Sequence, residues 1–219
     1  MSTLILVPQG AEYQAVCRGL SSVVNSPPQV LAIPMGIEPV RQYLQQLTHV
    51  SQQRVLMMGL CGSLSKKYQV GDIVLYQNCL YQGNLQECNH IFTADIHNQL
   101  QNDVSLVTGL TSDRLISTAT EKQQLHQQYN TDVVDMEGYP VLEFFQQFPN
   151  LGIAILRVVS DDTDHDIPDI TSAINADGSL KPLQLAWKLI RQPQSGTRLI
   201  RGSLQGLKTL TKITQLLFT

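Results

Sequence analysis

Long hydrophobic runs and the cysteine spacing of a metal site are both missing from this chain of 219 residues. No apolar stretch approaches the roughly 20 residues that cross a bilayer. The start of the chain, Met-Ser-Thr-Leu-Ile-Leu-Val-Pro, lacks the basic segment of a secretion signal. The four cysteines are scattered through a chain that is too long to depend on disulfides. We therefore expect a cytoplasmic protein with reduced thiols, with no metal and no other cofactor.

Acidic residues are absent from the segment 181–219, which carries seven of the 15 Lys and Arg residues. We interpret 166–219 as a basic helical extension of a single domain that covers 1–219. Two interpretations of this extension stay open. It is either an amphipathic helix packed on the acidic body, with Lys and Arg stems lying along the surface, or a contact to an anionic membrane that delivers a lipid-like substrate. A nucleic-acid partner is not expected.

The order of apolar and polar segments predicts the fold class. Short β-branched runs alternate with amphipathic segments of helix length, which is typical of a mostly parallel sheet covered by helices. Strands are predicted at 4–7, 30–33, 54–58, 72–81, 104–108, 133–136 and 153–159. Helices are predicted at 11–20, 38–47, 93–101, 120–129, 138–148, 183–191 and 198–217.

Two of the predicted strands end in carboxylates, and this is the best indication of function. The strand at 133–136 is followed by Glu137, and the strand at 153–159 is followed by Ser160 and Asp161. Because the carboxyl ends of parallel strands line the ligand crevice of an open α/β sheet, we expect Glu137 and Asp161 to face one pocket.

A glycine-containing block, Gly59-Leu-Cys-Gly62-Ser63, follows a third strand. Its glycines either let backbone amides approach a ligand or form a plain tight turn. The segment Thr111-Ser-Asp-Arg-Leu-Ile116 follows another strand, and there too a turn and a ligand contact are alternatives.

Four blocks of the sequence occur in a recognisable order: Gly59-x-Cys-Gly62-Ser-Leu64, Val70-Gly-Asp-Ile-Val74, Val134-Asp-Met-Glu-Gly138 and Arg157-Val-Val-Ser-Asp161. Over about residues 3–165 the chain resembles the purine nucleoside phosphorylase and methylthioadenosine/S-adenosylhomocysteine nucleosidase superfamily. Farther on, Ile167-Pro168, Asp177-Gly178 and the basic extension more closely resemble the hopanoid-associated, phosphorylase-like nucleosidases. The resemblance implies a three-layer α/β/α fold with a mixed, mostly parallel central sheet, and a homo-oligomer.

The reaction of this superfamily explains why carboxylates would be needed. Breaking an N-ribosidic bond leaves positive charge on the ribose and negative charge on the purine, so the site must protonate the base. The resemblance assigns proton donation to purine N7 to Asp161, with the adjacent Asp162 as the alternative. Burial beside a second carboxylate would favour the protonated form of Asp161. The resemblance gives Glu137 the two ribose hydroxyls, which an ionised carboxylate can accept; alternatively, Glu137 only complements the dipole of the helix that follows.

The matched blocks supply the other predicted site residues. Met136 would contact the face of the sugar or belong to the core. Ser160 and Arg157 would support the acid loop, although Arg157 could equally be a structural ion-pair partner. Leu115 stands where an aromatic residue usually stacks on the base, so base recognition would rest on the backbone of Ile116 and on apolar packing. The glycine block adds the predicted substrate contacts Cys61, Gly62 and Ser63.

The chain departs from the phosphorylases at the positions that bind phosphate. Met57 and Leu60 stand where phosphorylases place an arginine and a hydroxyl residue. Hydrolysis needs a base that orients water, and Glu12 matches an acidic position of the nucleosidases, although it could be only a first-turn helix carboxylate. Gly36 matches a glycine beside the sugar, whereas Glu38 replaces a second glycine.

The sequence therefore predicts an enzyme that cleaves the N-ribosidic bond of an adenosine-type, 5′-modified purine nucleoside and releases adenine. We favour hydrolysis over phosphorolysis. The basic extension favours a lipid-linked 5′ substituent over methylthio, because a membrane-embedded substrate must be met at the surface. Two alternatives stay open: a phosphorolytic enzyme, and a non-catalytic nucleoside-binding protein of the same fold.

Overall fold

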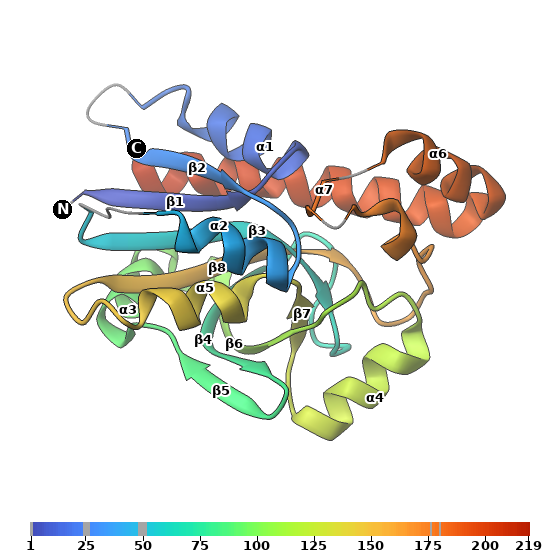
Figure 1. Ribbon diagram of the computed structural model, residues 1–219, viewed down its shortest axis with the longest axis horizontal. Helices are drawn as coiled ribbons and strands as arrows, with labels where there is room; N and C mark the ends of the chain where they lie inside the picture. Colours follow the sequence, from blue (N-terminus) through green and yellow to red (C-terminus); the bar gives the residue numbers. More distant parts are fainter. Residues whose placement is uncertain (1, 24–26, 48–51, 176, 180) are drawn as a thin grey trace.

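The computed structural model describes residues 2–23, 27–47, 52–175, 177–179 and 181–219. Within this part the chain forms one sheet with helices on both faces, which confirms the predicted three-layer α/β/α fold (Figure 1). The strands are β1 (Thr3–Pro8), β2 (Gln29–Ile33), β3 (Arg54–Ser63), β4 (Ile73–Tyr81), β5 (Asn84–Glu87), β6 (Val104–Thr111), β7 (Val133–Asp135) and β8 (Gly152–Asp161). The helices are α1 (Ala11–Leu20), α2 (Ile37–Gln45), α3 (His90–Leu100), α4 (Ala119–Tyr129), α5 (Gly138–Phe145), α6 (Pro182–Arg191) and α7 (Pro193–Phe218).

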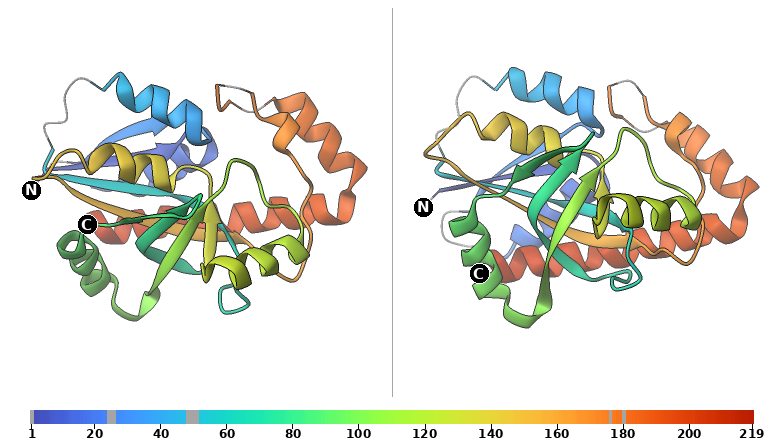
Figure 2. Two further views of the ribbon diagram at one scale, coloured as in Figure 1. Left: turned by 60° about the horizontal axis from the view of Figure 1, so that its bottom comes forward. Right: turned by 90° about the horizontal axis from the view of Figure 1, so that it is seen from below.

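Alternate side chains of each central strand pack against different helices. In β1, Leu4 and Leu6 belong to the apolar layer that includes α2 and α5, whereas Ile5 and Val7 belong to the layer that includes α1, α3 and α7. Because both faces are covered, the central strands are apolar on both sides, as in other sheets buried between helices. Figure 2 shows α7, in red, running along the sheet beside α1.

The sheet consists of two parallel blocks that run in opposite directions. β2, β1, β3 and β8 are parallel to one another, and so are β4, β6 and β7. Antiparallel pairing joins the blocks, β3 with β7 and β8 with β4. The strands β3, β8, β4, β6 and β7 therefore pair in a closed ring, which confirms a mixed sheet.

The strands that precede Glu137 and Asp161 do not run in the same direction, so the expectation based on parallel strand ends is wrong in that detail. β7 is antiparallel to β3, whereas β8 is parallel to it. The two strand ends still meet, because Gly62 of β3 is paired with Val134 of β7 on one side and with Asp161 of β8 on the other.

Two elements differ from the sequence prediction. β3 continues through Ser63, so the glycine block is extended strand and does not form the plain tight turn that was one of its two interpretations. β5 was not predicted, because Asn84-Leu-Gln-Glu87 has no apolar run and is mostly exposed. It pairs with β4 across a turn at Gln82 and Gly83, whose positive φ values suit a tight hairpin.

The C-terminal helices differ in how they contact the body. The last turns of α7 are buried in the core through Leu210 and Ile213, and the Thr211 hydroxyl donates to the carbonyl of Ala15 in α1 at 3.1 Å. The C-terminal half of the extension is therefore packed on the body, which agrees with its interpretation as an amphipathic helix that covers the body. α6 instead exposes apolar side chains, among them Leu183 and Trp187. None of the helices in the described residues is long and apolar enough to cross a membrane.

Candidate active site

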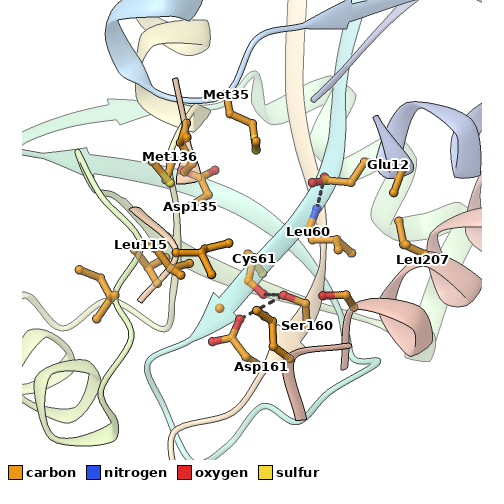
Figure 3. Close-up of a pocket in the computed structure, with 18 of the residues that line it drawn as sticks. Glu12, Met35, Leu60, Cys61, Leu115, Asp135, Met136, Ser160, Asp161 and Leu207 are labelled. Carbon is orange, nitrogen blue, oxygen red and sulfur yellow. Dashed lines mark hydrogen bonds between the residues drawn. The ribbon is translucent and has the colours of Figure 1, made fainter. Parts of the chain in front are cut away.

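A cavity of about 400 Å³ lies where the ends of β3, β7 and β8 meet. Its size is in the range of ligand sites. Figure 3 shows Glu12 beside Leu60 on one side of the cavity, and Asp161 beside Ser160 and Cys61 on another. Most of the predicted site residues line it: Glu12, Cys61, Gly62, Leu115, Ile116, Met136, Glu137, Ser160 and Asp161.

Three predicted site residues lie outside the lining. Ser63 is buried at the end of β3, and its hydroxyl donates to the carbonyl of Ser65 at 2.7 Å, so its predicted substrate contact has no support from the cavity lining. Gly36 contributes indirectly, because its N–H donates to Oε1 of Glu137 at 3.2 Å. Arg157 is fully buried beneath the cavity.

Arg157 holds two carboxylates in place. Its Nε and Nη2 donate to Oδ2 of Asp135 at 3.2 and 2.8 Å, and Nη2 also donates to Oε2 of Glu137 at 3.2 Å. Asp135 is fixed from its other oxygen by the Thr111 hydroxyl at 2.7 Å. Of the two predicted roles, the ion-pair role of Arg157 is the one observed. Asp135 was missed, although a carboxylate inside an apolar strand is a signal that it must have a buried partner.

Glu137 lines the cavity, and its carboxylate has hydrogen-bond acceptor sites that the protein does not fill. Oε1 accepts from Gly36 and Oε2 from Arg157, while each carboxylate oxygen has two acceptor sites. Burial raises the pKa of Glu137 above its usual value, and the Arg157 guanidinium opposes that rise. A ribose diol could therefore bind to acceptor sites that the protein leaves free.

Glu12 lies in the first turn of α1 and is partly accessible from the cavity. Its Oε2 accepts from the backbone N–H of Leu60 at 2.7 Å. Burial raises the pKa of Glu12 to about 7, with the Arg157 guanidinium acting in the opposite direction. A carboxylate with this pKa can accept a proton from water near neutral pH.

The Nη1 atom of Arg157 is buried and has no hydrogen-bond partner in the described part of the protein. Gly59 explains how it comes close to Glu12: a Cβ at this position would overlap both Nη1 of Arg157 and Oε2 of Glu12. The first glycine of the block therefore makes room for a base and a cation. A buried, unpaired donor in such a place needs a partner, and a small polar molecule between these two groups would supply one.

Asp161 is buried at the end of β8 and lines the cavity. Its Oδ1 is 3.1 Å from the Ser160 hydroxyl, which is also 3.2 Å from the carbonyl of Cys61. Gly62 lets the carboxylate lie against β3, because a Cβ there would be 2.8 Å from Oδ2 of Asp161. Ser160 thus supports Asp161, as predicted, and the second glycine of the block makes room for the predicted acid.

Asp162 points elsewhere. Its carboxylate accepts from the N–H of Asp164 at 3.0 Å and contacts the ring of His165 at 3.1 Å. Since Asp161 lines the cavity and Asp162 does not, the geometry favours the first of the two adjacent aspartates.

Lys122 is the charged partner of Asp161, and sequence reasoning missed it. Its ammonium contacts Oδ2 of Asp161 and donates to the carbonyl of Asp162 at 2.6 Å. We expected a second carboxylate beside Asp161, whereas the charge in contact with it is positive. Lys122 gave no signal in the sequence, because it stands in a polar helix where a lysine is usually solvated.

An apolar wall continues the cavity away from the carboxylates. Leu115, Ile116 and Met136 line it near the carboxylates, and the wall then follows α6 and α7. The side chains contributed by this part of the chain are Ile170, Ile174, Leu185, Leu189, Leu199, Ile200, Leu204 and Leu207. The sequence predicted the helices but not their place in the site.

Glu38, which replaces a second glycine of the nucleosidases, is exposed, and its carboxylate is paired with Arg41 at 2.9 Å.

Metal ligands are not grouped in the described residues, where no cluster of three or more His, Cys, Asp or Glu side chains has the geometry of an ion site. The buried charged groups in and around the cavity are its carboxylates, Arg157 and Lys122.

Comparison with known proteins gives a family and a fold. A family model described as the phosphorylase superfamily matches residues 19–181. Futalosine hydrolase of Helicobacter pylori strain 26695 is similar in structure, with a TM-score of 0.74 and 14% identity over 99% of this chain and 96% of that one. No curated protein matches the sequence.

Two nucleosidases are also similar in structure. The 5′-methylthioadenosine/S-adenosylhomocysteine nucleosidase of Helicobacter pylori, in complex with butyl-thio-DADMe-Immucillin-A, has a TM-score of 0.72 and 15% identity over 97% of this chain and 96% of that one. The corresponding nucleosidase of Streptococcus pneumoniae, in complex with 8-aminoadenine, has a TM-score of 0.65 and 18% identity over 95% of this chain and all (100%) of that one. At such low identities the likeness establishes the fold.

Proposed function

The chain belongs to the phosphorylase superfamily, and we propose that it hydrolyses the N-ribosidic bond of an adenosine-type nucleoside that carries an apolar 5′ substituent. One observation carries this proposal: Glu12, Glu137 and Asp161 line a single cavity, and each has a different polar or charged partner. The reaction needs an acid for the base, a group that holds the ribose, and a base for water. The cavity offers one carboxylate for each task.

Asp161 is assigned the acid role. As the bond from C1′ to the purine breaks, its electron pair moves to the base, and Asp161 delivers a proton to N7. Glu137 holds the two ribose hydroxyls with charge-assisted hydrogen bonds and fixes the sugar while positive charge develops on C1′. Met136, which lines the cavity beside Glu137, is assigned to the face of the sugar.

Glu12 is assigned the base role. A water bound between Oε2 of Glu12 and the unpaired Nη1 of Arg157 would satisfy the buried guanidinium donor and lose its proton to Glu12 as it attacks C1′. The pKa of about 7 suits this task, because the carboxylate is then both sufficiently ionised and sufficiently basic.

Hydrolysis is favoured over phosphorolysis by the charge around the water position. A phosphate there would face the carboxylates of Glu12 and Glu137, which repel it, and the attraction available to it is that of one guanidinium nitrogen, Nη1 of Arg157. The side chains of Met57 and Leu60 offer no hydrogen-bond donor that would compensate.

The apolar wall supplied by α6 and α7 supports the assignment of the 5′ substituent. It continues the cavity with leucine and isoleucine side chains, which match a hydrocarbon better than a charged amino acid. The resemblance to hopanoid-associated nucleosidases favours a lipid-linked group of this kind.

We also propose that α6 meets an anionic membrane in the cytoplasm, where such a substrate would be embedded. Leu183 and Ile190 are 87% and 77% exposed on this helix, close in sequence to Lys188 and Arg191. Exposed apolar side chains next to basic ones are typical of helices that lie at a membrane surface. Flotation with phosphatidylglycerol vesicles tests this membrane contact, and the double variant Leu183→Ser/Ile190→Ser should no longer float with the vesicles.

We further propose that the protein forms a homo-oligomer, which light scattering checks.

Base release is the direct test of the function. The protein is incubated with 5′-methylthioadenosine, S-adenosylhomocysteine, adenosine, inosine and a 5′-alkyl-adenosine, each with and without phosphate. We expect adenine and free ribose product, no dependence on phosphate, and the highest kcat/KM for the long alkyl substituent.

Two adjacent aspartates provide a matched pair of variants. Asp161→Asn should lose about 10²-fold or more in kcat, whereas Asp162→Asn should keep it. Phosphate-dependent release of ribose 1-phosphate would favour the phosphorolytic alternative. Tight nucleoside binding without any base release would favour a non-catalytic binding protein and refute the proposal.

A further inference from the structure

Lys122 is the buried residue of α4, a helix whose other side chains are polar or partly exposed. Its side chain is fully buried, and its ammonium contacts the carboxylate of Asp161 and the carbonyl of Asp162. Burying an ammonium is costly unless it is paired. The fold therefore places this charge against the predicted acid at a cost in stability.

Three further contacts tie the N-terminal end of α4 to the chain that follows Asp161. The N–H of Ala119 donates to Asp166 at 2.8 Å, the Gln123 amide donates to the carbonyl of Thr163 at 3.2 Å, and the N–H of Ile167 donates to the carbonyl of Ser117 at 2.9 Å. Lys122 is thus held in a fixed position relative to Asp161.

The contact creates a chemical difficulty for an acid. An ammonium in contact favours the ionised carboxylate, and an ionised carboxylate has no proton to give. Among the described residues, the hydrogen-bond partners of the Asp161 carboxylate are Ser160 and Lys122. Of these two, only the ammonium is an acid at the pH values at which enzymes work.

We propose that Lys122 is the positioning residue of Asp161 and the source of the proton that Asp161 hands to the leaving base. This inference rests on the proposed function. As the glycosidic bond breaks, negative charge grows on the purine, Lys122 passes one of its protons to the Asp161 carboxylate, and Asp161 gives that proton to N7. Lys122 is left as a neutral amine, the base leaves protonated, and Asp161 is again an ionised carboxylate. Solvent reprotonates Lys122 after product release.

The neighbourhood of Asp161 permits both of its protonation states. When ionised, Asp161 can accept from the Ser160 hydroxyl. When it carries the proton from Lys122 on Oδ2, its Oδ1 can still accept from the Ser160 hydroxyl, which also lies 3.2 Å from the Cys61 carbonyl. Ser160 therefore has a partner before and after the transfer.

The other titratable groups around Asp161 come from each element that packs against it. Cys61 on β3 is a thiol whose pKa is raised well above its usual value by burial, so it stays neutral. Asp162 is paired with His165 in the loop, and Asp164 is paired with the exposed Lys66 at 3.8 Å. Glu12, Asp135, Glu137 and the guanidinium-bearing Arg114 line the same cavity. Within the described residues, Lys122 is the cation in direct contact with Asp161.

The test is the pH profile of kcat in two substitutions at one position. Lys122→Met removes the charge and the proton, whereas Lys122→Arg keeps a charge that cannot be deprotonated. In Lys122→Met the alkaline limb of kcat should move to lower pH, with a loss of about 10²-fold at pH 8. Lys122→Arg should lose kcat at every pH, and KM should change by less than about 3-fold in both, because Lys122 does not line the cavity.

A matched control is Lys66→Met, which removes an exposed lysine that pairs with the same loop. It should keep the profile of the unsubstituted protein. Thermal melts report whether each variant folds.

Two outcomes would overturn the inference: full activity in Lys122→Arg, or an unchanged profile in Lys122→Met. Failure of the proposed function is a different result, because then the unsubstituted protein releases no base at any pH. Asp161→Asn separates the two, since it loses activity under the proposed function whether or not Lys122 supplies the proton.

Discussion

Replacing Glu12 by glutamine separates the charge of this side chain from its shape. Burial raises the pKa of Glu12 from 4.5 to about 7, so the folded protein binds this proton more tightly than the unfolded chain does. The stabilisation that results is complete below pH 4.5 and is lost as the pH rises through about 7. At pH 8 Glu12 is therefore ionised in the folded protein, and this buried charge lowers the free energy of unfolding. Glu12→Gln has no charge at this position and removes that destabilisation.

The magnitude follows from the two pKa values. Each tenfold difference in proton affinity between the folded and the unfolded protein corresponds to about 1.4 kcal/mol, so the ceiling is about 3 kcal/mol. Because Glu12 is partly accessible from the cavity, solvent screens part of this, and we expect Glu12→Gln to be more stable than the unsubstituted protein by about 1–2 kcal/mol at pH 8. Near pH 4.5 the difference should shrink, since Glu12 is then protonated in the folded state.

Urea unfolding at pH 4.5 and pH 8 measures the stability, and base release measures the catalytic effect. Without a base for water, kcat of Glu12→Gln should fall by about 10²-fold or more, and kcat/KM of the unsubstituted protein should rise with pH through about 7. Glu38→Gln is the control, because Glu38 also opens a helix but is 69% exposed. A stability difference that is the same at both pH values, or full activity in Glu12→Gln, would refute the reasoning.

Three further predictions concern other parts of the site. Gly62→Ala should lower kcat by about 10²-fold, because its Cβ would displace the Asp161 carboxylate, whereas Gly152→Ala in the same sheet should be tolerated; equal kcat in the two would contradict this. Arg157→Met should lose about 3–5 kcal/mol in urea unfolding, because it leaves buried carboxylates unpaired; a loss below about 1 kcal/mol would show that they are not held as ions. Leu204→Asp should raise KM for a 5′-alkyl-adenosine and leave KM for adenosine unchanged, since Leu204 lies in the apolar wall; an equal rise for both substrates would place the 5′ group elsewhere.

The position of the predicted carboxylates could be inferred from the sequence because it depends on local pattern. Glu137 and Asp161 each follow an apolar strand, and the family blocks give them roles. The argument from parallel strand ends failed in one respect, since β7 and β8 run in opposite directions. The side chains meet because Gly62 pairs with both strands, and this depends on a ring closure that no local pattern encodes.

The partners of these carboxylates could not be predicted in the same way. Lys122 and Asp161 are far apart in the sequence, and a lysine in a glutamine-rich helix has the composition of a solvated surface. The glycine block was expected either to bring backbone amides close to a ligand or to form a tight turn, but Gly59 and Gly62 belong to a strand and make space for other side chains. Such close approaches are properties of the packed structure, whereas turn propensity is a property of the local chain.

The balance of charge around the cavity links the fold to the reaction. Four carboxylates, Glu12, Asp135, Glu137 and Asp161, contact or lie close to two buried cations, Arg157 and Lys122, while a third cation, Arg114 of the cavity lining, is paired with Glu121. This excess of acidic groups fits the raised pKa values of Glu12 and Glu137, because burial beside other carboxylates disfavours ionisation. A neutral nucleoside does not relieve the imbalance, whereas a ribosyl group with positive charge at C1′ does. Since only interactions that strengthen in the transition state accelerate the reaction, the same excess that destabilises the empty site favours bond cleavage and opposes the entry of phosphate.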